Sequence, residues 1–231
     1  MQANADILIR TYPGDFCWLW HCLAAIERHA RGFRDIHIVV PEGDAGPLRH
    51  LTKEIIHECP RYQDDYLGQQ VTKMRADTYT DADLILHVDS DTILTRLTSP
   101  NDFFENGKTV LYHEPYERIG DFTWQLIVTE ILGWTPEHEF MRRHPFMYPR
   151  WLYGEARRII EQIHGMPFDE YVLSRPHRSF TEFNVLGAVA WKYFHDRFVW
   201  RFPEEGPVHV RQFWSWGGID AARAELEELA R

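Results

Sequence analysis

The sequence predicts an α/β domain with a mostly parallel central sheet that is flanked by helices. Short apolar runs of strand length alternate with stretches of helical period through the first part of the chain. The 231 residues are 44% hydrophobic and 26% charged, which is typical of a globular protein with a substantial core. No low-complexity linker interrupts the chain, so we expect one domain over residues 1–231.

The first half of the chain indicates a β-α-β-α order. Apolar residues from Phe16 to Ile26 recur at helical spacing, and Gly32 ends that segment. The other expected elements are strands over residues 6–11 and 36–40 and helices over residues 48–57 and 69–79. Strands that alternate with helices in this way pair in parallel.

The second half is less regular and richer in aromatic residues. The chain has nine Trp, ten Tyr and fourteen Phe, concentrated after residue 100, and most of them are expected in the core. The expected elements are strands over residues 110–112 and 208–213 and helices over residues 123–132, 154–164, 182–194 and 219–229.

Composition excludes several classes of function. A formal net charge of −10 argues against a general nucleic-acid binder, whose affinity comes largely from Lys and Arg. No window is long and apolar enough for a transmembrane segment, and the N-terminus lacks the pattern of a signal peptide, so we expect a cytoplasmic protein. Cys17, Cys22 and Cys59 have no C-x-x-C spacing, and we expect inert buried thiols.

An aspartate pair closes the most informative apolar run. Asp89 and Asp91 follow residues 84–88, and ligands of parallel sheets bind at the carboxyl ends of the strands. Hard oxygen ligands favour Mg²⁺ or Mn²⁺, commonly with substrate phosphates completing the coordination shell. The alternative is a strand-exit turn, in which Asp is common.

Two kinds of chemistry use such a pair. The segment Asp89-Ser90-Asp91-Thr92 matches the D-x-D-x-T motif of haloacid-dehalogenase-type phosphatases, in which the first Asp is the nucleophile. That motif normally lies on the first strand, whereas two β-α units precede it here. The other interpretation is sugar transfer, with the pair holding a metal ion against the diphosphate of a nucleotide-sugar donor.

The layout resembles a glycosyltransferase of the GT-A fold, a Rossmann-type fold, and in particular an uncharacterised bacterial family of nucleotide-sugar transferases. The segments that carry the resemblance are Arg10-Thr11-Tyr12-Pro13, Gln69 to Met74, the aspartate pair, Phe180 to Gly187, and His209 to Trp216. It implies a nucleotide-sugar-binding half over residues 1–112 and an acceptor half over residues 113–231. Thr181 and Asn184 depart from the acceptor segment of that family.

The resemblance also implies roles for individual residues. Asp89, Asp91 and His209 would hold Mn²⁺ or Mg²⁺, and Glu182 would be the general base of an inverting transfer. The donor, expected to be UDP-linked, would be bound by Arg10, Thr11, Tyr12, Asp15, Lys73, Asp89 and Ser90. The acceptor, a carbohydrate or glycoconjugate, would meet His144 and Trp214.

Each role has a structural alternative. Glu182 suits the first turn of a helix, and His209 lies on a strand, where a hydrogen-bonded structural His is common. Lys73 fits a solvated helix face and Trp214 fits a core position. A non-catalytic carbohydrate-binding protein with the same fold is a further alternative.

Overall fold

The central feature of the fold is a five-stranded sheet in the order β10-β4-β1-β2-β3. The computed structural model describes residues 4–50 and 53–229. Strand β1 pairs in parallel with β2 and β4, β2 pairs in parallel with β3, and β10 runs antiparallel to β4. The strands are β1 (Ala5–Arg10), β2 (Ile36–Pro41), β3 (Ile55–Cys59), β4 (Leu84–His87) and β10 (Phe146–Pro149). The predicted mostly parallel sheet is therefore confirmed.

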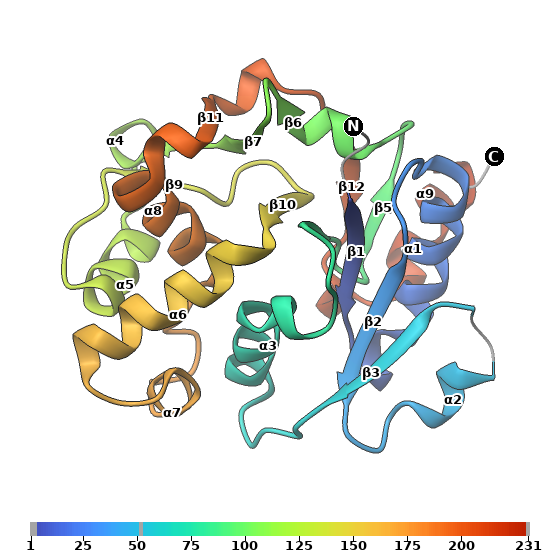
Figure 1. The fold of residues 1–231 in the computed structure, drawn as a ribbon. Coiled ribbons are helices and arrows are strands. Elements are labelled where there is room, and N and C mark those ends of the chain that lie inside the picture. The colour runs from blue at the N-terminus through green and yellow to red at the C-terminus, as the bar shows by residue number, and fades with distance from the viewer. Residues whose placement is uncertain (1–3, 51–52, 230–231) are drawn as a thin grey trace.

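Helices cover both faces of this sheet (Figure 1). The α-helices of the described residues are α1 (Phe16–His29), α2 (Gly46–Arg49), α3 (Asp65–Met74), α4 (Tyr116–Ile119), α5 (Thr123–Leu132), α6 (Arg150–His164), α7 (Phe168–Leu173), α8 (Glu182–Phe194) and α9 (Ile219–Leu229). Within the described residues, no helix combines the length and the apolar character needed to cross a membrane.

Smaller sheets connect the two halves of the chain. Their strands are β5 (Thr92–Leu94), β6 (Phe104–Glu105), β7 (Lys108–Tyr112), β8 (Glu114–Pro115), β9 (His138–Glu139), β11 (Phe198–Arg201) and β12 (Val210–Gln212). Strand β12 pairs antiparallel with β5, and β11 pairs in parallel with β7. The β5–β12 pair brings the C-terminal segment beside the aspartate pair.

Side chains of β1 alternate between two hydrophobic clusters, one on each face of the sheet. Ile7 and Ile9 pack with Trp18 of α1 in one cluster, whereas Leu8 packs in the other with residues of α3, α6 and α8. Because β1 is buried on both faces, its sequence is a nearly continuous apolar run without alternating polar residues. The same arrangement buries the side chains of β1 on both faces of the sheet.

The structure corrects the expected helix over residues 48–57. Helix α2 ends at Arg49 and β3 begins at Ile55, while residues 51 and 52 lie outside the described part of the chain. Strand β3 is the edge of the sheet and is only partly buried, so its mixed apolar and polar pattern resembles that of an amphipathic helix. Pairing with β2, in the register Ile38 to Ile56, decides its conformation.

Other differences are smaller. Strand β10 lies in a segment where no strand was expected, and β12 is shorter than the expected strand over residues 208–213. The helix expected over residues 69–79 is α3 followed by a 3₁₀ turn at Ala76–Thr78. Cys22 and Cys59 are buried as expected, but Cys17 is exposed because it lies on the outer side of the first turn of α1.

Candidate functional site

A cavity of about 410 Å³ lies where β1 and β4 end. It is lined by residues from both halves of the chain: Arg10, Thr11, Tyr12, Asp15, Tyr66, Gln69, Asp89, Ser90, Asp91, Trp124, Arg178, Gln212, Trp214 and Ser215. This position, at the carboxyl ends of parallel strands, is where ligands of such sheets bind. Most of the residues that the sequence suggested for donor binding meet here.

Carboxylates gather in the cavity around the aspartate pair. Asp89 and Asp91 lie between β4 and β5, and Asp15 ends the 3₁₀ turn that follows β1. Burial and the neighbouring Asp89 and Asp15 carboxylates raise the pKa of Asp91 to about 7. Burial likewise raises the pKa of Asp15. Carboxylates that repel one another in this way suit a divalent cation, because its charge would relieve the repulsion.

Backbone contacts fix the orientation of Asp91. Its Oδ2 accepts a hydrogen bond of 3.0 Å from the backbone N–H of Ser215, and its carbonyl oxygen accepts one of 2.8 Å from the N–H of Phe213. Both donors follow β12, so the β5–β12 pair positions this carboxylate. On the other side of the pair, the Sγ of Cys22 in α1 lies 3.6 Å from the carbonyl oxygen of Asp89.

Lys73 joins Asp89 to Glu182 across the two halves of the chain. Its Nζ lies 2.8 Å from Asp89 Oδ1 and 2.9 Å from Glu182 Oε1, and its side chain is 4% exposed. Burial opposes the charged form of Lys73, but the two carboxylates outweigh this effect and raise its pKa. Burial alone would raise the pKa of Asp89, yet Lys73 lowers it. Lys73 therefore keeps Asp89 ionised and in a fixed position.

Glu182 lies behind this ion pair at the start of α8. It is 4% exposed and is not among the residues that line the cavity. Its backbone N–H donates a hydrogen bond of 2.9 Å to Gln70 Oε1 of α3. Helices α3 and α8 thus hold the Lys73–Glu182 pair between them.

His209 lies apart from the aspartate pair. Its carbonyl oxygen accepts a hydrogen bond from the backbone N–H of Thr95. Thr95 lies four residues after Asp91, which corresponds to about 13 Å of extended backbone between the two residues. Its Nδ1 lies 3.0 Å from Thr98 Oγ1, and its ring packs against Phe103. Gln212 and Ser215, which the sequence did not single out, line the cavity in its place.

The other expected residues divide between the cavity and its surroundings. Trp214 is 62% exposed and lines the cavity. His144 does not line it; the ring packs on Phe146, and burial lowers its pKa to about 4 although nearby Asp89 opposes the shift. Arg10 is 6% exposed, and its Nε has no hydrogen-bond partner among the described residues.

Sequence reasoning missed four further lining residues. Tyr66, Trp124 and Gln69 belong to helices, where aromatic and amide side chains have many structural uses. Arg178 lies in the loop between α7 and α8 and has a positive φ of 62°. No local pattern distinguishes these positions, because they meet the aspartate pair only in the folded chain.

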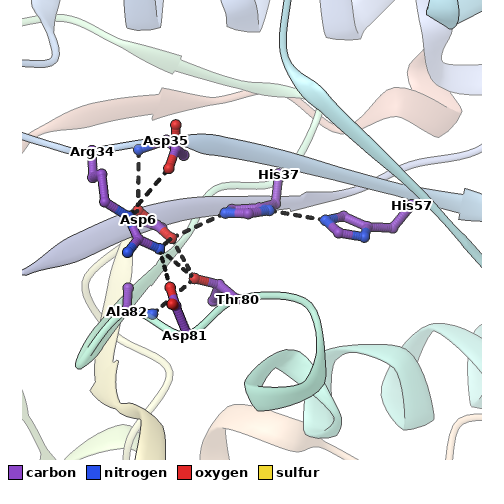
Figure 2. Close-up of polar contacts among 8 residues, drawn as sticks. All are labelled: Asp6, Arg34, Asp35, His37, His57, Thr80, Asp81 and Ala82. Atoms are coloured by element: carbon purple, nitrogen blue, oxygen red, sulfur yellow. Dashed lines mark hydrogen bonds and ion pairs between the residues drawn. The ribbon is translucent and has the colours of Figure 1, made fainter.

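A second cluster with metal-ligand chemistry lies at the other end of β1 (Figure 2). Ligand atoms of Asp6, Asp35 and His37 lie within 4.8 Å of one another, which is compatible with a divalent cation. The Asp6 carboxylate, however, already accepts bonds from Arg34 Nη2 at 2.7 Å and from the Asp35 N–H at 3.0 Å, and lies 3.0 Å from His37 Nε2. Arg34 therefore supplies the positive charge there.

Comparisons with known proteins agree with this architecture. In structure, the chain is similar to the galactosyltransferase LgtC, solved in complex with donor and acceptor sugar analogues, with a TM-score of 0.56. The likeness covers 97% of this chain and 95% of the other chain, and the two sequences are 12% identical. At this low identity the likeness shows a shared GT-A-like fold. Curated protein sequences give no significant match. The model of a family of unknown function, DUF6492, matches residues 21–201, and the chain belongs to that family.

Proposed function

We propose that this protein is a metal-dependent glycosyltransferase that moves a sugar from a nucleotide-diphosphate donor, expected to be UDP-linked, to an acceptor hydroxyl. The observation that carries the proposal is the aspartate pair in a cavity at the carboxyl edge of a parallel sheet. Burial, and after it the charges of the neighbouring Asp89 and Asp15 carboxylates, raise the pKa of Asp91, and a divalent cation would offset both effects. The likeness to a galactosyltransferase supports the same kind of reaction.

Asp89 and Asp91 are the proposed ligands of Mn²⁺ or Mg²⁺. Their oxygen donors fit either ion, and the ion would neutralise negative charge on the departing diphosphate. Asp15 lies in the same cavity and adds to its negative potential. His209 is not included in this proposed set, because its ring is bonded to Thr98 at the far end of the β5–β12 pair.

The nucleotide would lie over the end of β1. Arg10, Thr11 and Tyr12 line that side of the cavity, and the buried guanidinium of Arg10 is suited to a phosphate oxygen. Lys73 would act on the donor indirectly, since its ammonium is bonded to Asp89 and Glu182. Its proposed role is to hold Asp89 in the geometry that a metal ion needs.

The contacts of Glu182 favour a positioning role over that of a general base. A base must reach the proton of the acceptor hydroxyl, and this carboxylate is buried and bonded to Lys73 at 2.9 Å. We therefore propose that Glu182 anchors Lys73. The acceptor, a carbohydrate or glycoconjugate, would enter beside Trp124 and Trp214, whose rings suit the apolar faces of a sugar.

A ligand screen by thermal shift tests the function. UDP, GDP and inorganic phosphate are each added with and without Mn²⁺, because a ligand of the folded state raises the unfolding temperature with its occupancy. A shift with UDP that requires Mn²⁺ is expected, followed by hydrolysis or transfer from one member of a panel of UDP-sugars. A response to beryllofluoride in place of nucleotide would instead favour an aspartyl phosphatase. Nucleotide binding without any turnover would favour a carbohydrate-binding protein.

A further inference from the structure

We propose that Arg178 forms an additional anion-binding position in the cavity, for a carboxylate or phosphate ester on one of the two saccharide substrates. This inference rests on the proposed sugar transfer and specifies its substrate class as acidic. Arg178 is exposed, lines the cavity together with the aspartate pair, and has no ion pair or hydrogen bond within residues 4–50 and 53–229. Its guanidinium is thus available to a ligand.

The backbone at Arg178 is held in an unfavourable conformation. Its φ of 62° lies in the left-handed region, which residues with a side chain rarely adopt. The loop is tied to the start of α3 on both sides of Arg178. His177 Nδ1 lies 2.9 Å from Asp64 Oδ2, and the Tyr66 hydroxyl donates a hydrogen bond of 3.0 Å to the carbonyl oxygen of Phe180. Backbone strain that is maintained in this way is typical of functional positions.

The neighbouring arginine shows what a structural role in this loop looks like. Arg175 bonds the Ser179 carbonyl oxygen through Nε at 2.7 Å and pairs with Glu130 at 2.6 Å. Arg178 has no such partner in the described part of the chain, although acidic residues outnumber basic ones by 35 to 25 in the full sequence. An unpaired guanidinium in an acidic protein, on a loop that is held beside the cavity, is suited to bind an anion from outside the chain.

The remaining charges of the cavity indicate which anion this is. A metal ion on Asp89 and Asp91 would take up the diphosphate, with Arg10 beside it, so these groups already account for the phosphates of a nucleotide. Arg178 shares the cavity with Trp124 and Tyr66, whose rings can carry a sugar. An acidic group on a sugar ring would satisfy the guanidinium and the aromatic rings at once.

Binding measurements on four variants test this inference. Arg178→Ala and Arg178→Gly remove the guanidinium, Arg178→Lys keeps the charge without the planar fork, and Arg96→Ala is the matched control. Arg96 is exposed and lies outside the cavity, so its loss changes the net charge equally. The donor arm compares UDP-glucuronate with UDP-glucose in Mn²⁺. The acceptor arm compares glucuronate and glucose 6-phosphate with glucose, in UDP and Mn²⁺.

We expect the wild-type protein to prefer the acidic ligand in one arm. That preference should fall by roughly 10-fold to 100-fold in Arg178→Ala and Arg178→Gly and persist in Arg96→Ala. Arg178→Lys should keep part of it. Arg178→Gly should unfold at the same or a higher temperature, because glycine adopts a positive φ without strain.

Two results would overturn the inference. One is the same affinity for acidic and neutral ligands in both arms. The other is an equal loss of affinity for UDP itself in Arg178→Ala, which would assign the guanidinium to the diphosphate. The proposed sugar transfer fails separately, if the wild-type protein does not bind UDP with Mn²⁺. In that case the affinities for glucuronate, glucose 6-phosphate and glucose, measured without UDP, still show whether Arg178 selects anionic ligands.

Discussion

Two charged networks lie at opposite ends of the same parallel strands and differ in how completely their charges are paired. At the amino end of β1, the Asp6 carboxylate is hydrogen-bonded to Arg34, His37, Thr80 and the Asp35 N–H. Burial alone would raise the pKa of Asp6, but these hydrogen bonds outweigh burial and lower the pKa. At the carboxyl end, burial and neighbouring carboxylates raise the pKa of Asp91 to about 7. The charges of the amino-end network are satisfied within the fold, whereas the unpaired carboxylate of the carboxyl-end network is suited to a ligand.

Lys73 is the exception within the carboxyl-end cluster, because it pairs two carboxylates and is itself buried. Replacing Lys73 by Met should lower the free energy of unfolding by about 3–5 kcal/mol, since it leaves two buried carboxylates without a cation. Urea denaturation measures the change, and Lys108→Met, at an exposed lysine of β7, is the control.

The partner residue separates positioning from base catalysis. Glu182→Gln leaves Lys73 paired with Asp89, so the double variant Lys73→Met/Glu182→Gln should be more stable than Lys73→Met alone. If Glu182→Gln instead keeps its stability and donor affinity but loses about 10²-fold to 10⁴-fold in turnover, Glu182 is a general base and the positioning role is wrong.

Asp6→Asn tests the amino-end network. Loss of the charge leaves Arg34 and His37 without their shared carboxylate, and we expect the free energy of unfolding to fall by about 3 kcal/mol. This value is the lower end of the about 3–5 kcal/mol that is usual when one partner of a buried ion pair is removed. The lower end applies because the Arg34 side chain is 40% exposed and can be hydrated when its partner is lost. Affinity for UDP in Mn²⁺ should not change. Loss of that affinity in a variant of normal stability would place the metal ion at Asp6, Asp35 and His37 instead.

Asp91→Asn should have the opposite effects to Asp6→Asn, with a loss of UDP affinity and no loss of stability. We expect the Mn²⁺-dependent affinity for UDP to fall by at least about 100-fold, more than is usual for residues that only contact a metal ligand. The unfolding temperature should stay the same or rise, because one repelling carboxylate is removed. Asp196→Asn, at a fully exposed aspartate, is the control for the lost charge. UDP affinity equal to that of the wild type would exclude Asp91 as a ligand.

The smallest expected effect is a pH dependence of the metal-free protein. The ordinary pKa of Asp91 is 3.8 and its folded value is about 7, so between these values the folded state binds more protons than the unfolded state. Stability therefore falls as pH rises through this window. Asp6, with a lowered pKa, contributes stability above its ordinary pKa that is lost as pH falls. Thermal unfolding at about pH 5 and about pH 7.5 should show a smaller decline in Asp91→Asn than in the wild type.

The sequence was sufficient for the central strands and for the aspartate pair. Strands β1, β2 and β4 are buried on both faces or nearly so, and their continuous apolar runs identify them without tertiary information. The pair was recognisable because it follows such a run directly. Edge strands such as β3 carry a mixed pattern that fits a helix equally well, and pairing with a neighbour decided their conformation.

The surroundings of the pair depended on long-range contacts. Lys73 and Glu182 are 109 positions apart, and nothing in either local pattern predicts that they meet. The register of the β5–β12 pair likewise places His209 away from Asp91 and brings the backbone N–H of Ser215 to the Asp91 carboxylate. Local sequence thus determined which strand ends carry the acidic groups, because burial patterns are local. Tertiary packing alone decided which cations and backbone donors reach them, because those partners come from elements far along the chain.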